Sequence, residues 1–270
     1  MSSSRNRYHA AMERSWNRFV RYPAPREHGV QVYRDVDELA ATVAAYLTAG
    51  LEQGEPAVVV ATEAHWRRIS EGLEEAGWMD ERGLIVDAEA EATLAAIMVD
   101  GKLSQASFAR VVGGLLDQAT ARFPYKQVRV FGEMVDLLVA QENLEGAVAL
   151  EAQWHRLLEA RGCFSLLCAY HIDVFDRAAQ VSLLPTVCGA HSHVLPAEDP
   201  ERLHRAVDAA LEETLGATDA GRVYAMIADQ IRQTPVPASQ LALMWVSVEM
   251  PAVAQRVLSS AQGKYLQDAA

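Results

Sequence analysis

Long hydrophobic runs are missing from this chain of 270 residues, and cysteine is scarce in it. No apolar run approaches the ~20 residues that cross a bilayer, so we expect no membrane span. The segment from Met1 to Arg5 lacks the apolar core of a secretory signal, and we therefore expect a cytoplasmic protein. The three cysteines, Cys163, Cys168 and Cys188, are an odd number, which argues against a disulfide framework.

Basic residues are also few: 24 Lys and Arg stand against 36 Asp and Glu, for a net charge of -12. This balance makes direct nucleic-acid binding by the body of the protein unexpected. Residues 1–27 are the exception, with six arginines and two glutamates. In this basic arm Met12, Trp16 and Phe19 or Val20 fall at helical spacing, which predicts a short helix docked on the acidic body. A membrane-surface arm or a nucleic-acid arm are the alternatives.

Half of the residues are hydrophobic, enough for a full core, and they follow an alternating pattern. The pattern predicts strands over 28–33, 56–62, 83–88, 127–131 and 163–170, and helices over 35–53, 63–76, 89–99, 104–122 and 143–161. Strands separated by helix-length segments indicate a doubly wound α/β fold with a mostly parallel sheet. A further strand over 186–191 is expected at an edge.

The segment 196–200 contains two prolines and predicts a boundary. Beyond it, helical patterns cover 201–215, 221–232 and 241–257. The predicted organisation is therefore a basic arm over 1–27, an α/β domain over 28–195 and a helical C-terminal region over 196–270.

A glycine-rich phosphate loop is missing after both of the first two predicted strands. Residues 62–68 read TEAHWRR and residues 34–37 read RDVD, without the glycines or the Lys-Ser/Thr pair that cradle phosphates. ATP hydrolysis is therefore not expected. Residual nucleotide binding, with Arg67 or Arg68 reaching a phosphate, remains an alternative.

Several short segments, in this order and spacing, resemble a known family. They are His28 and Tyr33 on the first strand, GLEQGE over 50–55, Thr62 and His65, Asp100 and Gly101, FGE over 131–133, LEAQW over 150–154 and LCAY over 167–170. Together they are similar to the MEDS domain (methanogen/methylotroph, DcmR sensory domain) over roughly 28–195.

The resemblance implies a fold similar to the RecA/KaiC type without its ATPase motifs. Members of this family occur beside DNA-binding domains, histidine kinases and other signalling modules, including transcription regulators. They are inferred to sense small molecules such as hydrocarbon derivatives. No helix-turn-helix or kinase pattern is recognisable here, so the output is expected to pass through a partner protein, the C-terminal helices or a homodimer contact made by them.

Glu133 follows a central predicted strand, and α/β sheets bind ligands at the carboxyl ends of their strands. This position predicts that Glu133 contacts a ligand. The alternative is that Glu133 is a structural carboxylate. With the other strand-end residues and the resemblance, the expected ligand contacts are His28, Tyr33, Thr62, His65, Asp87, Glu133, Glu151 and Tyr170. Trp154 is expected in the core, and Glu151, on the same helix face, either pairs with Arg129 or lines the pocket.

Two Cys-x-x-His pairs offer an alternative metal site. Its ligands would be Cys168, His171, Cys188, His191 and His193. Cys168 lies inside a predicted strand, where residues three apart point to opposite faces, so no metal is expected. No Gly-x-Ser-x-Gly elbow is present, and neither catalytic residues nor a cofactor are expected.

The leading hypothesis is a non-enzymatic module that senses a small, apolar molecule. One alternative is a protein interaction module without a ligand, whose apolar face would be Leu241, Leu243, Met244, Trp245 and Val248. The other is a degenerate nucleotide-binding or metal-binding enzyme.

Overall fold

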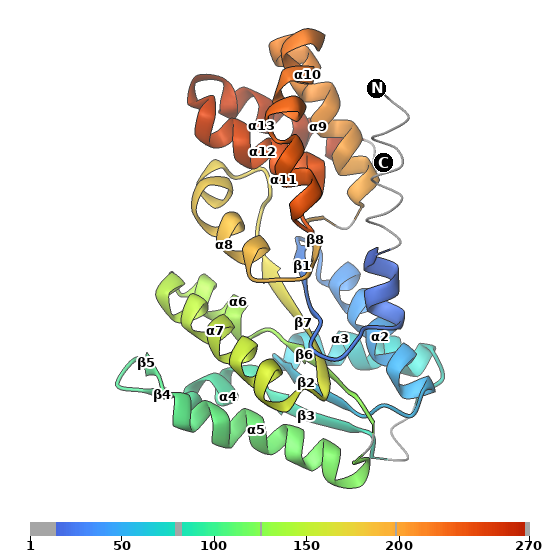
Figure 1. Ribbon diagram of the computed structural model, residues 1–270. Helices are drawn as coiled ribbons and strands as arrows, with labels where there is room; N and C mark the ends of the chain where they lie inside the picture. Colours follow the sequence, from blue (N-terminus) through green and yellow to red (C-terminus); the bar gives the residue numbers. More distant parts are fainter. Residues whose placement is uncertain (1–14, 79–82, 125, 198, 268–270) are drawn as a thin grey trace. The chain divides into compact units, whose positions relative to one another are not determined.

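A computed structural model describes residues 15–78, 83–124, 126–197 and 199–267. The first 14 residues of the basic arm, Met12 included, lie outside the described residues, while residues 15–21 are helical. The chain divides into two compact units. The α/β unit consists of 17–29 and 35–170, and the helical unit contains 30–34 and 171–270 (Figure 1).

A six-stranded sheet has the order β3-β2-β6-β7-β1-β8, which confirms the predicted α/β class. Its strands are β1 (His28–Tyr33), β2 (Ala57–Ala61), β3 (Ile85–Glu89), β6 (Val128–Gly132), β7 (Phe164–His171) and β8 (His193–Leu195). Within the α/β unit, β2 pairs in parallel with both β3 and β6, and β6 pairs in parallel with β7. The β2, β6 and β7 residues in these pairings are buried, as continuous apolar strands covered on both faces should be.

Helices cover both faces of this sheet (Figure 1). They are α2 (Val36–Glu52), α3 (Glu63–Glu75), α4 (Ala90–Ile97), α5 (Gln105–Arg122), α6 (Met134–Ala140) and α7 (Leu144–Arg161). The chain moves from β2 outward to β3 through α3, then back to β6 and β7 through α5 and α7. Right-handed crossovers therefore place α2 and α3 on one face and α5 and α7 on the other.

Capping side chains mark the starts of several helices at the positions that the sequence predicted. Asp35 caps α2, Thr62 caps α3 and Asn143 caps α7, each by accepting backbone N–H groups of the first turn. Helix α7 ends at Gly162, whose φ of 60° is the left-handed conformation that glycine adopts readily.

Several features differ from the sequence prediction. The helix expected over 221–232 is divided between α10 (Ala217–Met226) and α11 (Ala228–Gln233), and the helix expected over 241–257 is divided at Pro251, where a second helix begins. Residues 186–191 form no strand: Leu184–Gly189 is helix α8, preceded by a π-helical turn over Ala179–Leu183, and the edge strand is β8 instead. Pro185 at the start of α8 suits the first turn of a helix, where a missing N–H costs nothing. Helix α6 was not anticipated, and neither was the hairpin of β4 (Met98–Val99) and β5 (Lys102–Leu103), which turns at Asp100 and Gly101 with positive φ at both residues.

A buried arginine organises one end of the α/β unit. Arg129 on β6 is 1% exposed and donates from Nε to Glu55 at 2.6 Å. Its other nitrogens donate to the carbonyls of Val20, Arg21 and Tyr46, and its guanidinium lies 5.0 Å from the centre of the Tyr46 ring. A Cβ on Gly50 would lie 2.5 Å from Arg129 Cγ, so this position has room only for glycine.

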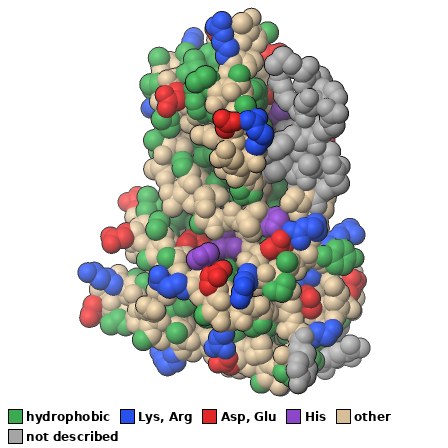
Figure 2. Space-filling view, in the orientation of Figure 1, with side chains coloured by type: hydrophobic (Ala, Val, Ile, Leu, Met, Phe, Trp, Pro, Cys, Tyr) green, Lys and Arg blue, Asp and Glu red, His purple; other side chains and the backbone are tan. Residues whose placement is uncertain are grey.

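The helical unit contains α9 (Pro200–Leu215), α10 (Ala217–Met226), α11 (Ala228–Gln233), α12 (Ala238–Glu249) and α13 (Pro251–Gln267). Helix α9 is amphipathic and buries Leu203, Val207 and Leu211, as its sequence predicted. In the described part of the chain, no helix has both the length and the apolarity to cross a membrane. On the face shown in Figure 2, blue and red side chains stand interspersed, and the described residues there form no large patch of one sign.

Candidate functional site

Glu133 lies at the carboxyl end of β6, where its side chain meets the start of α3. One carboxylate oxygen accepts the backbone N–H of Thr62, and the other lies 2.5 Å from Nδ1 of His65. The backbone N–H of Glu133 continues the ladder by donating to Val60 of β2 at 3.1 Å. The structure therefore brings together three of the predicted ligand contacts: Thr62, His65 and Glu133.

Within this trio, Thr62 and His65 are partly exposed, and Glu133 is buried. The side chain of His65 is 17% exposed, whereas that of Glu133 is 2% exposed. The hydrogen bond that His65 donates to Glu133 raises the pKa of His65, and the neighbouring charges of Glu133 and Asp136 raise it further against the opposing effect of burial. Glu133 therefore acts on the imidazole as a buried partner that fixes its orientation and favours its protonated form.

Several of the backbone N–H groups at this edge already have partners within the chain. The N–H of Thr62 donates to Glu133, and the N–H of His65 donates to the Thr62 hydroxyl. At the start of α4, Glu89 accepts from the N–H groups of Glu91 and Ala92. The Thr62 hydroxyl and the Glu89 carboxylate thus cap the starts of α3 and α4, the kind of helix start that binds phosphate in nucleotide-binding folds.

A hollow of about 420 Å³ lies beside the trio, at the carboxyl ends of β2 and β3. The first turns of α3 and α4 line it with Thr62, Glu63, Ala64, Arg67, Glu89 and Glu91. Its volume falls in the ~300–1,000 Å³ range of small-molecule sites. Three carboxylates and one guanidinium make this lining polar, whereas an apolar ligand was expected from the sequence.

A second cluster, fully buried, forms around the start of β1 and the end of β7. His28 Nε2 lies 3.2 Å from the Cys168 Sγ and 3.7 Å from a Glu151 carboxylate oxygen. The Tyr170 hydroxyl donates to the other Glu151 oxygen at 2.6 Å. Burial, and then the charge of Glu151, raises the pKa values of Cys168 and Tyr170 well above their usual ranges. This cluster, which we call the His28 cluster, brings together three more predicted residues.

Glu151 therefore lies in the His28 cluster and does not pair with Arg129, whose carboxylate partner is Glu55. The expected core position of Trp154 is confirmed: it is 1% exposed and meets Phe108 edge to face, with ring centres 5.3 Å apart. The sequence pattern did not identify Glu55 as the partner of Arg129, because Glu55 lies in a loop just before β2.

The two remaining predicted contacts lie elsewhere. Asp87 is exposed in the middle of β3, opposite Val59, two residues before the strand ends. Tyr33 packs against His171 in the helical unit, with ring centres 5.3 Å apart.

The alternative metal ligands are divided between the units. Cys168 belongs to the α/β unit, while His171, Cys188, His191 and His193 belong to the helical unit. His191 Nδ1 lies 2.6 Å from the Val187 carbonyl, and His193 Nδ1 lies 3.3 Å from the Ser15 hydroxyl. Among the described residues, no three of those four side chains come close enough together to hold a metal ion.

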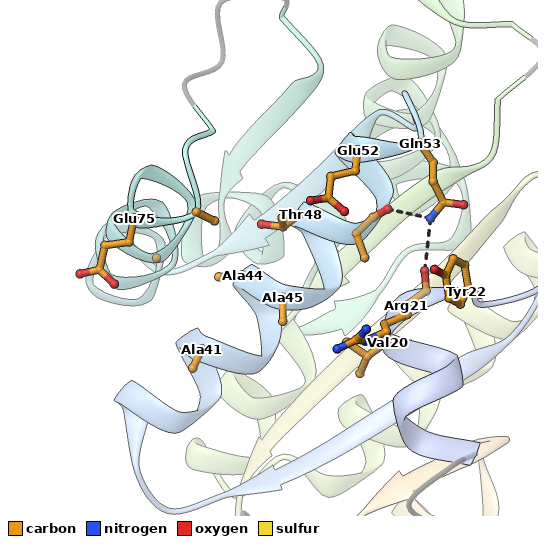
Figure 3. A pocket seen from close by; sticks show the side chains of 13 residues that line it. Val20, Arg21, Tyr22, Ala41, Ala44, Ala45, Thr48, Glu52, Gln53 and Glu75 are labelled. Carbon is orange, nitrogen blue, oxygen red and sulfur yellow. Dashed lines mark hydrogen bonds between the residues drawn. The ribbon is translucent and has the colours of Figure 1, made fainter.

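Another hollow in the α/β unit, of about 590 Å³, lies away from the strand ends (Figure 3). Small side chains of α2, among them Ala41, Ala44 and Ala45, form one wall, and Gln53 closes one end by donating to the Arg21 carbonyl. This hollow has fewer charged groups than the one at the strand ends, and it supplies a comparison site for ligand experiments.

The helical unit has a hollow of its own, of about 530 Å³. Leu241, Met244, Trp245 and Val248 of α12 line it at the spacing of one helix face. Leu243, which the sequence had placed on the same apolar face, is 1% exposed and does not line this hollow.

Comparison with models of protein families gives one match. The MEDS model, described as the methanogen/methylotroph, DcmR sensory domain, matches residues 27–186, which is more than half of the chain. A search among curated proteins found no match. The matched residues include both the trio at the strand ends and the His28 cluster.

Proposed function

Because the chain belongs to the MEDS family of sensory domains, we propose that it senses a small polar molecule at the carboxyl ends of β2 and β3. The ligand occupies the hollow beside Thr62 and contacts His65 and Arg67. The buried Glu133 carboxylate orients His65 through the hydrogen bond to its Nδ1. The observation that carries the proposal is the His65–Glu133 pair, because a buried carboxylate at a central strand end holds a partly exposed imidazole in the first turn of α3, and Glu63 and Ala64 of that turn line the hollow.

The proposed role is binding without turnover. Both oxygens of Glu133 accept hydrogen bonds from the chain itself, so the carboxylate is a positioning group and not a general base for a substrate. The helix starts that would hold a triphosphate are capped by side chains. Both observations support a sensor over a nucleotide-dependent enzyme.

The output of this sensor is proposed to reach a partner protein or a second copy of the chain through the C-terminal helices. The apolar face of α12 formed by Leu241, Met244, Trp245 and Val248 supports this role, since Val248 is 53% exposed. The same face supports the second candidate function, a protein interaction module that needs no ligand.

A thermal-shift screen of small amines, amides and alcohols tests the sensing role. A compound that binds the native protein raises its unfolding midpoint in a concentration-dependent way. We expect Arg67→Ala to abolish the shift, because Arg67 lines the hollow. Arg68→Ala is the matched control: this neighbouring arginine pairs with Asp37 and Glu71 and does not line the hollow.

Two further variants separate the alternatives. Ala45→Trp fills the hollow of Figure 3 from an exposed position of α2 and should leave the shift unchanged. If Ala45→Trp abolishes the thermal shift and Arg67→Ala does not, the ligand binds in the hollow of Figure 3 and the proposed site at the strand ends is wrong. For a sensor, Val248→Asp should weaken self-association or partner binding without altering the thermal shift caused by the ligand. For an interaction module without a ligand, Val248→Asp should weaken the same association, and no compound should stabilise the native protein.

A further inference from the structure

We propose that the His28 cluster is a zinc site, with His28, Glu151 and Cys168 as ligands. One nitrogen of His28, the Cys168 Sγ and a Glu151 carboxylate oxygen all lie within 4.8 Å of one another. Imidazole nitrogen, thiolate sulfur and carboxylate oxygen are the donors that zinc takes in proteins. The site goes beyond the proposed ligand hollow, since it shares no residue with it.

The two distances from His28 Nε2 to the other ligand atoms match the edges of a coordination tetrahedron. Zinc bonds of ~2.0–2.3 Å place neighbouring ligand atoms about 3.5 Å apart. His28 Nε2 lies 3.2 Å from Cys168 Sγ and 3.7 Å from Glu151 Oε2. A single ion can therefore contact these three atoms with small shifts of the side chains.

The three ligands come from three elements that the fold holds rigidly. His28 opens β1, Glu151 lies in the middle of α7, and Cys168 lies within the buried strand β7. Their exposed fractions are 5%, 8% and 0%. Ligands on regular elements are positioned more exactly than ligands on loops, and burial excludes competing water.

Tyr170 supplies the outer shell of this site. It donates to one Glu151 oxygen at 2.6 Å, which leaves the other oxygen turned toward His28. Carboxylate ligands of metals are commonly fixed by such a hydrogen bond. Cys168 and Tyr170 lie two residues apart on β7, so their side chains point to the same face of the strand. This is the face that contacts His28 and Glu151.

Charge balance also favours a divalent cation. Zinc displaces the thiol proton on binding, so one thiolate and one carboxylate neutralise the two positive charges of the ion. A buried centre without net charge avoids most of the desolvation cost that an isolated buried carboxylate carries. A tetrahedral ion has a fourth coordination position, which remains for a further donor.

Metal titration of the full chain tests the proposal. The protein is dialysed against a chelator and then titrated with Co²⁺, a spectroscopic substitute for Zn²⁺. We expect one ion per chain, intense visible bands of a tetrahedral site, and a thiolate-to-cobalt charge-transfer band, followed by displacement of Co²⁺ by Zn²⁺. A native protein that gives no charge-transfer band, or that binds no ion after reduction of its thiols, overturns the assignment.

Variants locate the site. Cys168→Ser should remove the charge-transfer band, and Tyr170→Phe should weaken binding about 10–100-fold, as loss of an outer-shell partner does. Cys163→Ser and His155→Ala are matched controls in the same unit, with a half-buried thiol and an exposed imidazole that lie outside the cluster. Binding that survives in Cys168→Ser with an unchanged spectrum would mean an adventitious ion and refute the proposal.

The outcome is separable from that of the proposed function. His65→Ala and Arg67→Ala should retain the metal, and Tyr170→Phe should retain the ligand-induced thermal shift. Failure of one assignment therefore leaves the other standing.

Discussion

Replacement of Arg129 by methionine should destabilise the α/β unit strongly. Methionine keeps most of the aliphatic volume but removes the ion pair with Glu55 at 2.6 Å and the hydrogen bonds to the carbonyls of Val20, Arg21 and Tyr46. Removal of one partner from a buried ion pair costs about 3–5 kcal/mol. For a unit of this size, each kcal/mol lowers the unfolding midpoint by roughly 2–4 °C, so we expect a decrease of about 10 °C.

Arg161→Met is the matched control for this experiment. Arg161 also pairs with a carboxylate at 2.6 Å, that of Asp117, but the two side chains are 40% and 60% exposed. Exposed ion pairs contribute about 0–1 kcal/mol. The free energies of unfolding of both variants are measured by urea titration. If Arg129→Met costs no more than Arg161→Met, the reasoning that burial makes the Arg129 network essential is refuted.

Three more outcomes follow from the same unit. Gly50→Ala should cost about 1–3 kcal/mol in urea titration, because its Cβ would lie 2.5 Å from Arg129 Cγ; an unchanged stability would contradict this close approach. Trp154→Ala should cost about 3–5 kcal/mol by the same measurement, since the ring is 1% exposed, and a loss below ~1 kcal/mol would contradict its core role. The hydrogen bond that His65 donates to Glu133 raises the folded-state pKa of His65 above its unfolded value of 6.5, so the stabilising contribution of this bond is complete below pH 6.5 and is lost as pH rises through the folded pKa. The stability difference between the native protein and His65→Gln should therefore be larger at pH 6 than at pH 9, and a difference that grows with pH would reverse the argument.

The sheet and most helices of the α/β unit were predictable because their signals are local. Continuous apolar strands and capping residues such as Asp35, Thr62 and Asn143 appear at the positions where the elements begin. The hairpin at Asp100 and Gly101 was missed although its two-residue turn is a recognisable signal, because its strands have only two residues each. The strand expected over 186–191 failed because short apolar runs do not distinguish strand from helix.

The candidate site was predictable only in part. Position at a strand end drew attention to Glu133, and the fold then places Thr62 and His65 against it. The pairing of Glu151 with Tyr170, and of Arg129 with Glu55, depends on contacts between residues 19 and 74 positions apart. Sequence spacing carries no information about which charged groups meet across a core, and so the His28 cluster could emerge only from the assembled fold.

Titration calorimetry with a compound that stabilises the native protein tests whether the ligand binds at the carboxyl ends of β2 and β3. We expect His65→Ala to bind this compound at least about tenfold more weakly, a loss of ~1.4 kcal/mol, and Arg68→Ala to bind it as the native protein does. Equal affinity of His65→Ala and the native protein would contradict a sensory site at the carboxyl ends of β2 and β3.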